Sequence, residues 1–295
     1  MGVGGAQCRP LPFRRYLDFC LRVILSENRF PSPIKSMTGF SESCARLKRS
    51  SFLLDWKVYG RTDRHYIKLY RQHTGLLCYV LLDKSNSMAY RSSRSDLSKL
   101  EYASYLAAAL SFLIIKQGDR AGFCLFDDDV SRYHPPGATL PHIFGILREL
   151  EYLRPGGRTR LSVSLRKAFH LTKRRGLVIV ISDFLDDPDE IFRTLGMFLH
   201  KKFEVVLFHV LHEHELHLPD LDSARFVDLE RHDSLVAEPE VIRRAYQEEM
   251  ESYLRRMRAQ AQSRRIDYTL VSTSTHYNEV IEKYLGVRQA LTWAK

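Results

Sequence analysis

The feature that most constrains the fold is a regular alternation of short apolar runs and longer amphipathic segments from residue 76 onward. Two of these runs, 76–82 and 177–182, contain almost no polar side chain, which is typical of strands buried on both faces of a sheet. Strands that alternate with helices pair in parallel, because each helix carries the chain back across the sheet. The sequence therefore predicts an α/β fold with a doubly wound, mostly parallel sheet and helices on both faces.

The remaining elements follow from periodicity and from turn residues. Ser98 and Glu101 have the spacing of a capping box, so a helix is expected to begin after Ser98. Further strands are expected at 120–126, 203–211 and 266–271, with a short hairpin partner at 130–134. Further helices are expected at 141–150, 161–172, 187–200, 238–261 and 276–285.

The chain before residue 76 divides into two parts. Residues 1–54 show no clear periodicity, so this end is expected to be a divergent or poorly ordered segment. From Asp55 onward, apolar and polar residues alternate around a turn at 60–63, which predicts a β-hairpin at 55–75. Residues 76–295 are expected to form one α/β domain.

Charge and cysteine content argue against several classes of protein. The net charge of +10 lies almost entirely in residues 1–75, which hold 14 Lys and Arg against 5 Asp and Glu. The nearly neutral remainder is therefore not expected to bind nucleic acid. No apolar run reaches the roughly 18 residues of a membrane span, so none is expected. The five cysteines form no CxxC pair, which favours a reducing, cytoplasmic location.

Oxygen-bearing side chains follow two of the predicted strands where each strand ends. Asp83, Ser85 and Ser87 come directly after the first strand, in the stretch YVLLDKSNSMAY, and Asp183 follows the second fully apolar strand. If the strand order reverses between these strands, the two carboxylates meet at the edge where doubly wound sheets bind ligands. Carboxylates and hydroxyls are hard ligands, so the sequence predicts a Mg²⁺ or Mn²⁺ site, to which Thr159 adds a fifth oxygen from a nearby loop.

Each of these residues also has a purely structural interpretation. Asp83 and Asp183 can cap neighbouring helices or turns, and Thr159 can be the N-cap of the helix that follows it. The histidine-rich segment HVLHEHELH at 209–217 allows a zinc site, but it lacks paired cysteines and H-E-x-x-H spacing. We expect this segment to be a solvent-exposed loop.

The combination of these motifs resembles a known family. D-x-S-x-S after a buried first strand, a loop threonine and an aspartate after a later strand are similar to the metal-ion-dependent adhesion site of von Willebrand factor A domains. Segments such as DWKVYGRTDRHYIK, KLEYASYLAAAL, GGRTRLSVSL and VIVISDFLDD resemble the bacterial domain of unknown function 58 family, over about residues 55–290. The resemblance implies that the metal-site positions are Asp83, Ser85, Ser87, Thr159 and Asp183.

Two places depart from the family pattern. Lys84 stands where a smaller residue is expected between Asp83 and Ser85. Its side chain is expected to point away from the site, although an ammonium group nearby would weaken metal binding. CARLKRSSFLL stands where family members carry an R-x-Y-x-x-G-D segment, so we interpret the start of the chain as a divergent or misread extension.

Signatures of nucleotide-binding enzymes and serine hydrolases are missing, since the sequence has no G-x-G-x-x-G after the first strand, no G-x-x-x-x-G-K-[ST] and no G-x-S-x-G. No histidine or glutamate beside Asp83 or Asp183 is an evident general base. The better interpretation is a non-enzymatic binding module in which a partner's Asp or Glu completes the metal shell. The resemblance implies a MoxR-type AAA+ ATPase as the partner, in protein maturation or stress response. The alternative is a metal-dependent, phosphatase-like hydrolase that uses the same Asp and Ser residues.

Overall fold

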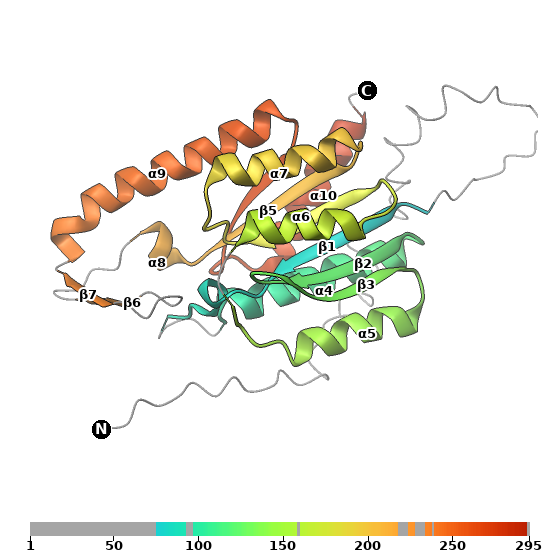
Figure 1. Ribbon diagram of the computed structural model, residues 1–295, viewed down its shortest axis with the longest axis horizontal. Coiled ribbons are helices and arrows are strands. Elements are labelled where there is room, and N and C mark those ends of the chain that lie inside the picture. The colour runs from blue at the N-terminus through green and yellow to red at the C-terminus, as the bar shows by residue number, and fades with distance from the viewer. Residues whose placement is uncertain are drawn as a thin grey trace, which may run out of the picture.

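A six-stranded sheet forms the centre of the molecule (Figure 1). The computed structural model describes residues 75–92, 97–157, 160–217, 224–227, 234–237 and 239–293. The predicted N-terminal segment, the predicted hairpin up to residue 74, and Thr159 lie outside the described residues.

The strand order confirms the predicted fold class. The sheet runs β3-β2-β1-β4-β5-β8, and all neighbouring pairs are parallel except β2 and β3, which are antiparallel. The first described strand, β1, therefore lies in the middle of the sheet, and the strand order reverses beside it, which places the switch point between β1 and β4. The strands are β1 (Leu77–Asp83), β2 (Arg120–Phe126), β3 (Val130–Gly137), β4 (Leu177–Ser182), β5 (Glu204–Leu211) and β8 (Asp267–Ser272).

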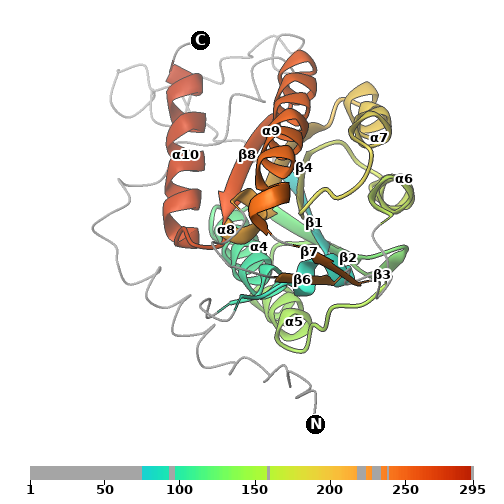
Figure 2. The ribbon, with the colours of Figure 1, turned by 90° about the vertical axis from the view of Figure 1, so that its left-hand side faces the viewer.

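Helices cover both faces of this sheet (Figure 2). The side chains of β1 alternate between two cores: Val80 and Leu82 belong to one, Tyr79 and Leu81 to the other. Helices α4 (Lys99–Lys116), α5 (Leu140–Glu151) and α10 (Tyr277–Trp293) cover the first core. Helices α6 (Leu161–Leu171), α7 (Pro188–His200) and α9 (Pro239–Ser263) cover the second.

Several short elements differ from the sequence-based expectations. The structure adds η2 (Asn86–Ala89), α8 (Glu213–Leu216) and an antiparallel pair of strands, β6 (Ala224–Val227) and β7 (Ser234–Ala237). The expectation of a solvent-exposed loop at 209–217 is wrong. His209 belongs to β5 and is 0% exposed, and His212 caps α8 and is 4% exposed. Aromatic neighbours that are distant in the sequence bury both rings, and sequence periodicity does not reveal them.

Most predicted element boundaries agree with the structure. The helix expected after Ser98 begins there, and both hydrogen bonds of the predicted Ser98–Glu101 capping box are present. The largest difference lies in α10, which runs to Trp293 instead of ending at 285. None of the helices in the described ranges combines the length and the apolar character that a bilayer crossing needs.

Candidate metal centre

Asp83 and Asp183 lie at the ends of neighbouring strands. Asp83 is the last residue of β1, and Asp183 follows Ser182, the last residue of β4. Leu82 pairs with Ile181 in the parallel ladder, so both aspartates leave the sheet at the same edge. They are 1% and 0% exposed. The structure therefore brings together two carboxylates that are far apart in the sequence, and it buries both.

Asp83 is held by neutral donors. Its Oδ1 accepts a hydrogen bond from the backbone N–H of Ser85 at 2.9 Å, and its Oδ2 accepts one from Oγ of Ser182 at 2.6 Å. Oγ of Ser182 accepts in turn from the backbone N–H of Phe184 at 3.0 Å. These bonds fix the direction of both carboxylate oxygens, but no cation in the described part of the chain forms an ion pair with Asp83.

Ser85 and Ser87 lie together beside Asp83. Their Oγ atoms are 2.9 Å apart, and the residues are 0% and 6% exposed. Ser85 is extended, with ψ of 163°, and the chain then turns into η2 at Asn86. A tight turn, rather than a continued strand, therefore brings the two hydroxyls to one place.

The loop that leads to Thr159 begins beside this turn. The N–H of Gly156 donates to the carbonyl of Lys84 at 2.9 Å, and the N–H of Asn86 donates to the carbonyl of Gly157 at 3.1 Å. Gly157 has φ of +77°, and a Cβ there would lie 2.8 Å from a neighbouring side chain, so this turn requires glycine. Thr159 itself lies outside the described residues, and its role as a fifth ligand stays a prediction.

Asp183, unlike Asp83, has a cation beside it. Lys99, the first residue of α4, is 0% exposed, and its Nζ donates to Oδ2 of Asp183 at 2.8 Å. The same ammonium donates to Oε1 of Glu215 in α8 at 2.7 Å. Oε2 of Glu215 accepts from the backbone N–H of His212 at 2.8 Å. One buried ammonium thus connects α4, the end of β4 and α8.

The two halves of the site therefore differ in their electrostatics. Burial, together with the charge of Asp183, raises the pKa of Asp83 to about 7, although its hydrogen bonds oppose the rise. Burial alone would lower the pKa of Lys99, but the charges of Asp183 and Glu215 outweigh it and raise that pKa. Lys99 is a stable cation at neutral pH, whereas ionised Asp83 lacks a counter-charge of its own within the described ranges.

Lys99, Ser182 and Glu215 are the members of the site that sequence reasoning missed. A weak signal for Lys99 exists in the sequence, because the helix dipole disfavours a lysine in the first turn of a helix. Ser182 and Glu215 have no such signal. Their roles depend on which strand end and which loop the fold places beside them.

Lys84 turns away from the two carboxylates. Although it directly follows Asp83, its ammonium forms an ion pair with Asp127, the residue after β2. This agrees with the expectation that its side chain points away. The ammonium that does reach the site belongs to Lys99.

The backbone directly after Asp183 adopts a rare conformation. Phe184 has φ of 52°, in the left-handed region that residues other than glycine seldom occupy, and it is fully buried. Its carbonyl accepts a hydrogen bond from Tyr253 of α9, and its ring packs against His209 at 5.2 Å between centroids. These tertiary contacts hold the conformation that directs Asp183 toward α4.

The histidine-rich segment has a structural role in this fold. Nδ1 of His209 lies 2.7 Å from the hydroxyl of Tyr268, and burial lowers the pKa of this histidine to about 4. Nδ1 of His212 accepts the N–H of His214 at 3.1 Å at the start of α8. Within the described ranges, no cluster of three or more His, Cys, Asp or Glu residues is suited to a metal ion. The candidate centre falls outside that description because it combines two carboxylates with hydroxyls.

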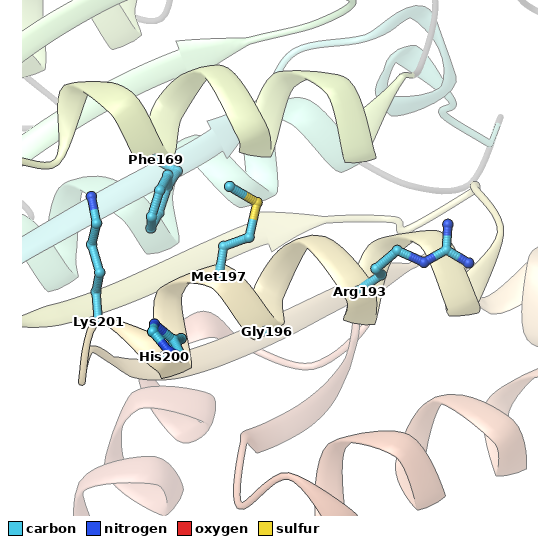
Figure 3. Close-up of a pocket in the computed structure, with 6 residues that line it drawn as sticks. All are labelled: Phe169, Arg193, Gly196, Met197, His200 and Lys201. Atoms are coloured by element: carbon cyan, nitrogen blue, oxygen red, sulfur yellow. The ribbon is translucent and has the colours of Figure 1, made fainter.

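A separate groove with a volume of about 410 Å³ lies between α6 and α7 (Figure 3). Its lining residues are Phe169, Arg193, Gly196, Met197, His200 and Lys201. Nζ of Lys201 lies 4.0 Å from the centre of the Phe169 ring. The lining contains no carboxylate or hydroxyl, so this groove is distinct from the predicted cation site.

The comparison with protein families gives a clear result. Residues 51–256, well over half of the chain, match the family described as "Protein of unknown function DUF58". The chain belongs to this family. The resemblance inferred from the sequence motifs is therefore confirmed at the level of the DUF58 family.

Similar proteins include relatives known by sequence and proteins of known structure. Uncharacterized proteins of Mycobacterium tuberculosis (strain ATCC 25618 / H37Rv) and Mycobacterium bovis are each 27% identical over 180 residues, which cover 60% of this chain and 56% of theirs. The chain thus spans about half the length of these relatives. The structure of the conserved hypothetical protein BatB from Bacteroides thetaiotaomicron is 18% identical, with a TM-score of 0.47, over 72% of this chain and 98% of BatB. A von Willebrand factor type A structure from Catenulispora acidiphila is 16% identical, with a TM-score of 0.36, over 46% of this chain and 33% of its own.

Proposed function

We propose that this DUF58 protein is a non-enzymatic, metal-ion-dependent protein-binding module. Its proposed partner is a MoxR-type AAA+ ATPase, or a client protein, that offers an Asp or Glu side chain to the metal. The proposed location is the cytoplasm. The family membership and the motif resemblance support the partner class, and the geometry of the site supports the metal.

One observation carries the proposal: Asp83 is a buried carboxylate beside a second one, without a cation of its own in the described chain. Such a group is costly to keep ionised unless a positive charge joins it. The donors around it are hard oxygens, which suit Mg²⁺ or Mn²⁺. The residues that would hold the ion are Asp83, Ser85, Ser87 and Asp183, with Thr159 as the expected fifth. When bound, the ion would supply a positive charge for a carboxylate of the partner.

The same residues are poorly arranged for nucleophilic catalysis. The hydroxyl oxygens of Ser85 and Ser87 lie within hydrogen-bond distance of each other, and both oxygens of Asp83 accept hydrogen bonds. His209 pairs with Ser182 between β4 and β5, but its Nδ1 lies 2.7 Å from the hydroxyl of Tyr268. A serine without a base next to it acts as a ligand more readily than as a nucleophile.

Access to the site requires movement. The four described ligand residues are at most 6% exposed, so a partner's carboxylate cannot reach them in this conformation. We therefore propose that partner binding is coupled to an opening of the loops at this edge of the sheet. A binding measurement with metal but without partner separates the two steps.

The proposal is tested by recovery of a purified MoxR-type ATPase on the immobilised chain. We expect recovery in Mg²⁺ and its loss in EDTA and in Asp83→Ala. Asp129→Ala is the matched control, because Asp129 is an acidic residue near the same sheet edge that pairs with Lys167 at the surface. Equal recovery under all conditions would reject metal-dependent binding.

The phosphatase-like alternative is tested with the same preparations. Hydrolysis of a phosphomonoester in Mn²⁺ is expected to be absent from both the natural chain and Asp83→Ala. Turnover that needs Mn²⁺ and disappears in Asp83→Ala would instead make Asp83 part of an active site.

A further inference from the structure

Lys99 combines complete burial, contact with a predicted metal ligand and an unfavourable position in its helix. It is 0% exposed, its ammonium lies 2.8 Å from Oδ2 of Asp183, and it stands at the first position of α4, where the helix dipole disfavours a positive charge. Burying an ammonium is costly, so its position must be compensated by the two carboxylates that it contacts. The fold therefore places a cation of its own inside the candidate metal centre.

A tethered ammonium and a divalent cation have the same requirement, which is access to carboxylate oxygens. We propose that Lys99 is a built-in counter-ion of Asp183 that competes with the divalent cation for this carboxylate and so sets the metal affinity of the site. This inference rests on the proposed metal-dependent function and names the residue that regulates it. Lys99 is a positioning and affinity-determining residue, not a ligand.

Glu215 is the second carboxylate that binds the ammonium of Lys99. It accepts the same ammonium at 2.7 Å and is less enclosed than Asp183, with a side chain that is 21% exposed against 0%. When Asp183 turns to a metal, Lys99 still has Glu215 as a partner, so it does not become an isolated buried charge. Glu215 thus lowers the free-energy cost of moving Asp183 from Lys99 to the metal.

Glu215 also connects this exchange to other elements. Its Oε2 accepts from the N–H of His212 at the start of α8, and its carbonyl accepts from the hydroxyl of Tyr246 in α9 at 2.7 Å. A change in how Lys99 divides its bonds between Asp183 and Glu215 therefore acts on α8 and α9. Metal binding at Asp183 is thereby coupled to the positions of α8 and α9.

The test is the affinity of the purified chain for Mn²⁺ alone, measured by titration calorimetry on the natural chain, Lys99→Met and Lys84→Met. Removing a competing charge is expected to tighten Mn²⁺ binding by about tenfold or more in Lys99→Met. Lys84→Met is the matched control, because Lys84 is the same residue type next to Asp83 but pairs with Asp127. It is expected to change the affinity less than about twofold.

The outcomes separate this inference from the proposed function. If the natural chain binds Mn²⁺ and folded Lys99→Met binds it no more tightly, the competition is refuted and the metal-dependent function stands. If only Lys99→Met binds Mn²⁺, the competition is supported, and Lys99 replaces the metal in the natural chain, which overturns metal dependence. If neither binds Mn²⁺, both proposals fall.

Glu215→Gln keeps the inference testable if Lys99→Met does not fold. Without the second carboxylate, Lys99 depends on Asp183 alone, so Mn²⁺ binding is expected to weaken about threefold or more. Glu213→Gln is the control, since Glu213 lies in the same short helix and is exposed. Equal Mn²⁺ affinities in the two glutamine variants would contradict the role of Glu215.

Discussion

The β1 half and the β4 half of the candidate centre hold matching carboxylates in different surroundings. Asp83, at the end of β1, is bonded to the N–H of Ser85 and the hydroxyl of Ser182, whereas Asp183, after β4, is bonded to the ammonium of Lys99. Both are almost inaccessible to solvent. Burial alone therefore does not decide how stable a charge is at this edge; a counter-ion within hydrogen-bond distance does.

This contrast has a thermodynamic consequence. Asp183 and Lys99 have already lost their hydration, and each depends on the other, so removing either leaves a buried charge that is less well compensated. Asp83 has no such partner among the residues that the structure describes, so its negative charge destabilises the metal-free fold. Removing the charge of Asp183 should therefore lower the free energy of unfolding, whereas removing the charge of Asp83 should not lower it and can raise it.

The largest effect is expected in the β4 half. Asp183→Asn leaves Lys99 buried with only Glu215 beside it, so we predict a loss of about 3 kcal/mol in the free energy of unfolding. Urea unfolding in EDTA at pH 8 measures it. Asp83→Asn is the matched comparison and should lose no stability under these conditions. An equal loss in both variants would show that the two halves are not different.

The second effect concerns metal binding in the β1 half. Mn²⁺ at about 100 times its dissociation constant is expected to stabilise the natural chain by about 2.7 kcal/mol, since the ion binds only the folded state. Asp83→Asn should lose this stabilisation, because the amide carries no charge for the ion. Thermal unfolding with and without Mn²⁺ reports both. Stabilisation of Asp83→Asn as large as that of the natural chain would exclude Asp83 as a ligand.

The third effect is a pH dependence with a defined sign. The pKa of Asp83 is raised to about 7, mainly by burial and by Asp183, so in EDTA the fold loses stability as the pH rises from about 4 to 7. His209 acts oppositely: its pKa is lowered to about 4 by burial, so its contribution to stability is lost as the pH falls from 6.5 to 4. In the difference between Asp83→Asn and the natural chain the His209 contribution cancels.

That difference in the free energy of unfolding is expected to increase by about 3 kcal/mol in favour of Asp83→Asn between pH 4 and pH 7, and to level off above about pH 8. Urea unfolding at several pH values in EDTA measures it. A difference that does not depend on pH would mean that Asp83 is not destabilised by its surroundings.

The sequence predicted the strands and helices that form the site better than it predicted the ion pairs within the site. Apolar runs and a capping box predicted the order of strands and helices along the chain. Strand-end positions predicted that Asp83 and Asp183 meet only if the strand order reverses between their strands, and the structure supplies that reversal. Those signals are local and periodic. The pairing of Lys99 with Asp183 is neither, because it depends on where α4 enters the fold relative to β4.

The same limit explains why the sequence indicated Lys84, and not Lys99, as the lysine near the metal site. Lys84 is next to Asp83 along the chain, but alternation along the backbone turns its side chain toward Asp127. Lys99 lies in a separate helix, yet it is the lysine that reaches the site. Neighbourhood in the sequence is a poor guide to ion pairs when the site is assembled from the ends of several elements.

The smallest effect is expected from replacing Lys84. This replacement tests whether Asp83 lacks a counter-ion among the described residues. Lys84→Met removes an ion pair whose side chains are 17% and 12% exposed, and partly hydrated pairs of this kind contribute about 1 kcal/mol or less. We therefore predict a loss of at most about 1 kcal/mol in urea unfolding, with the pH dependence assigned to Asp83 unchanged. If Lys84 were instead the counter-ion of Asp83, its removal would steepen that pH dependence, and the contrast between the two carboxylates would disappear.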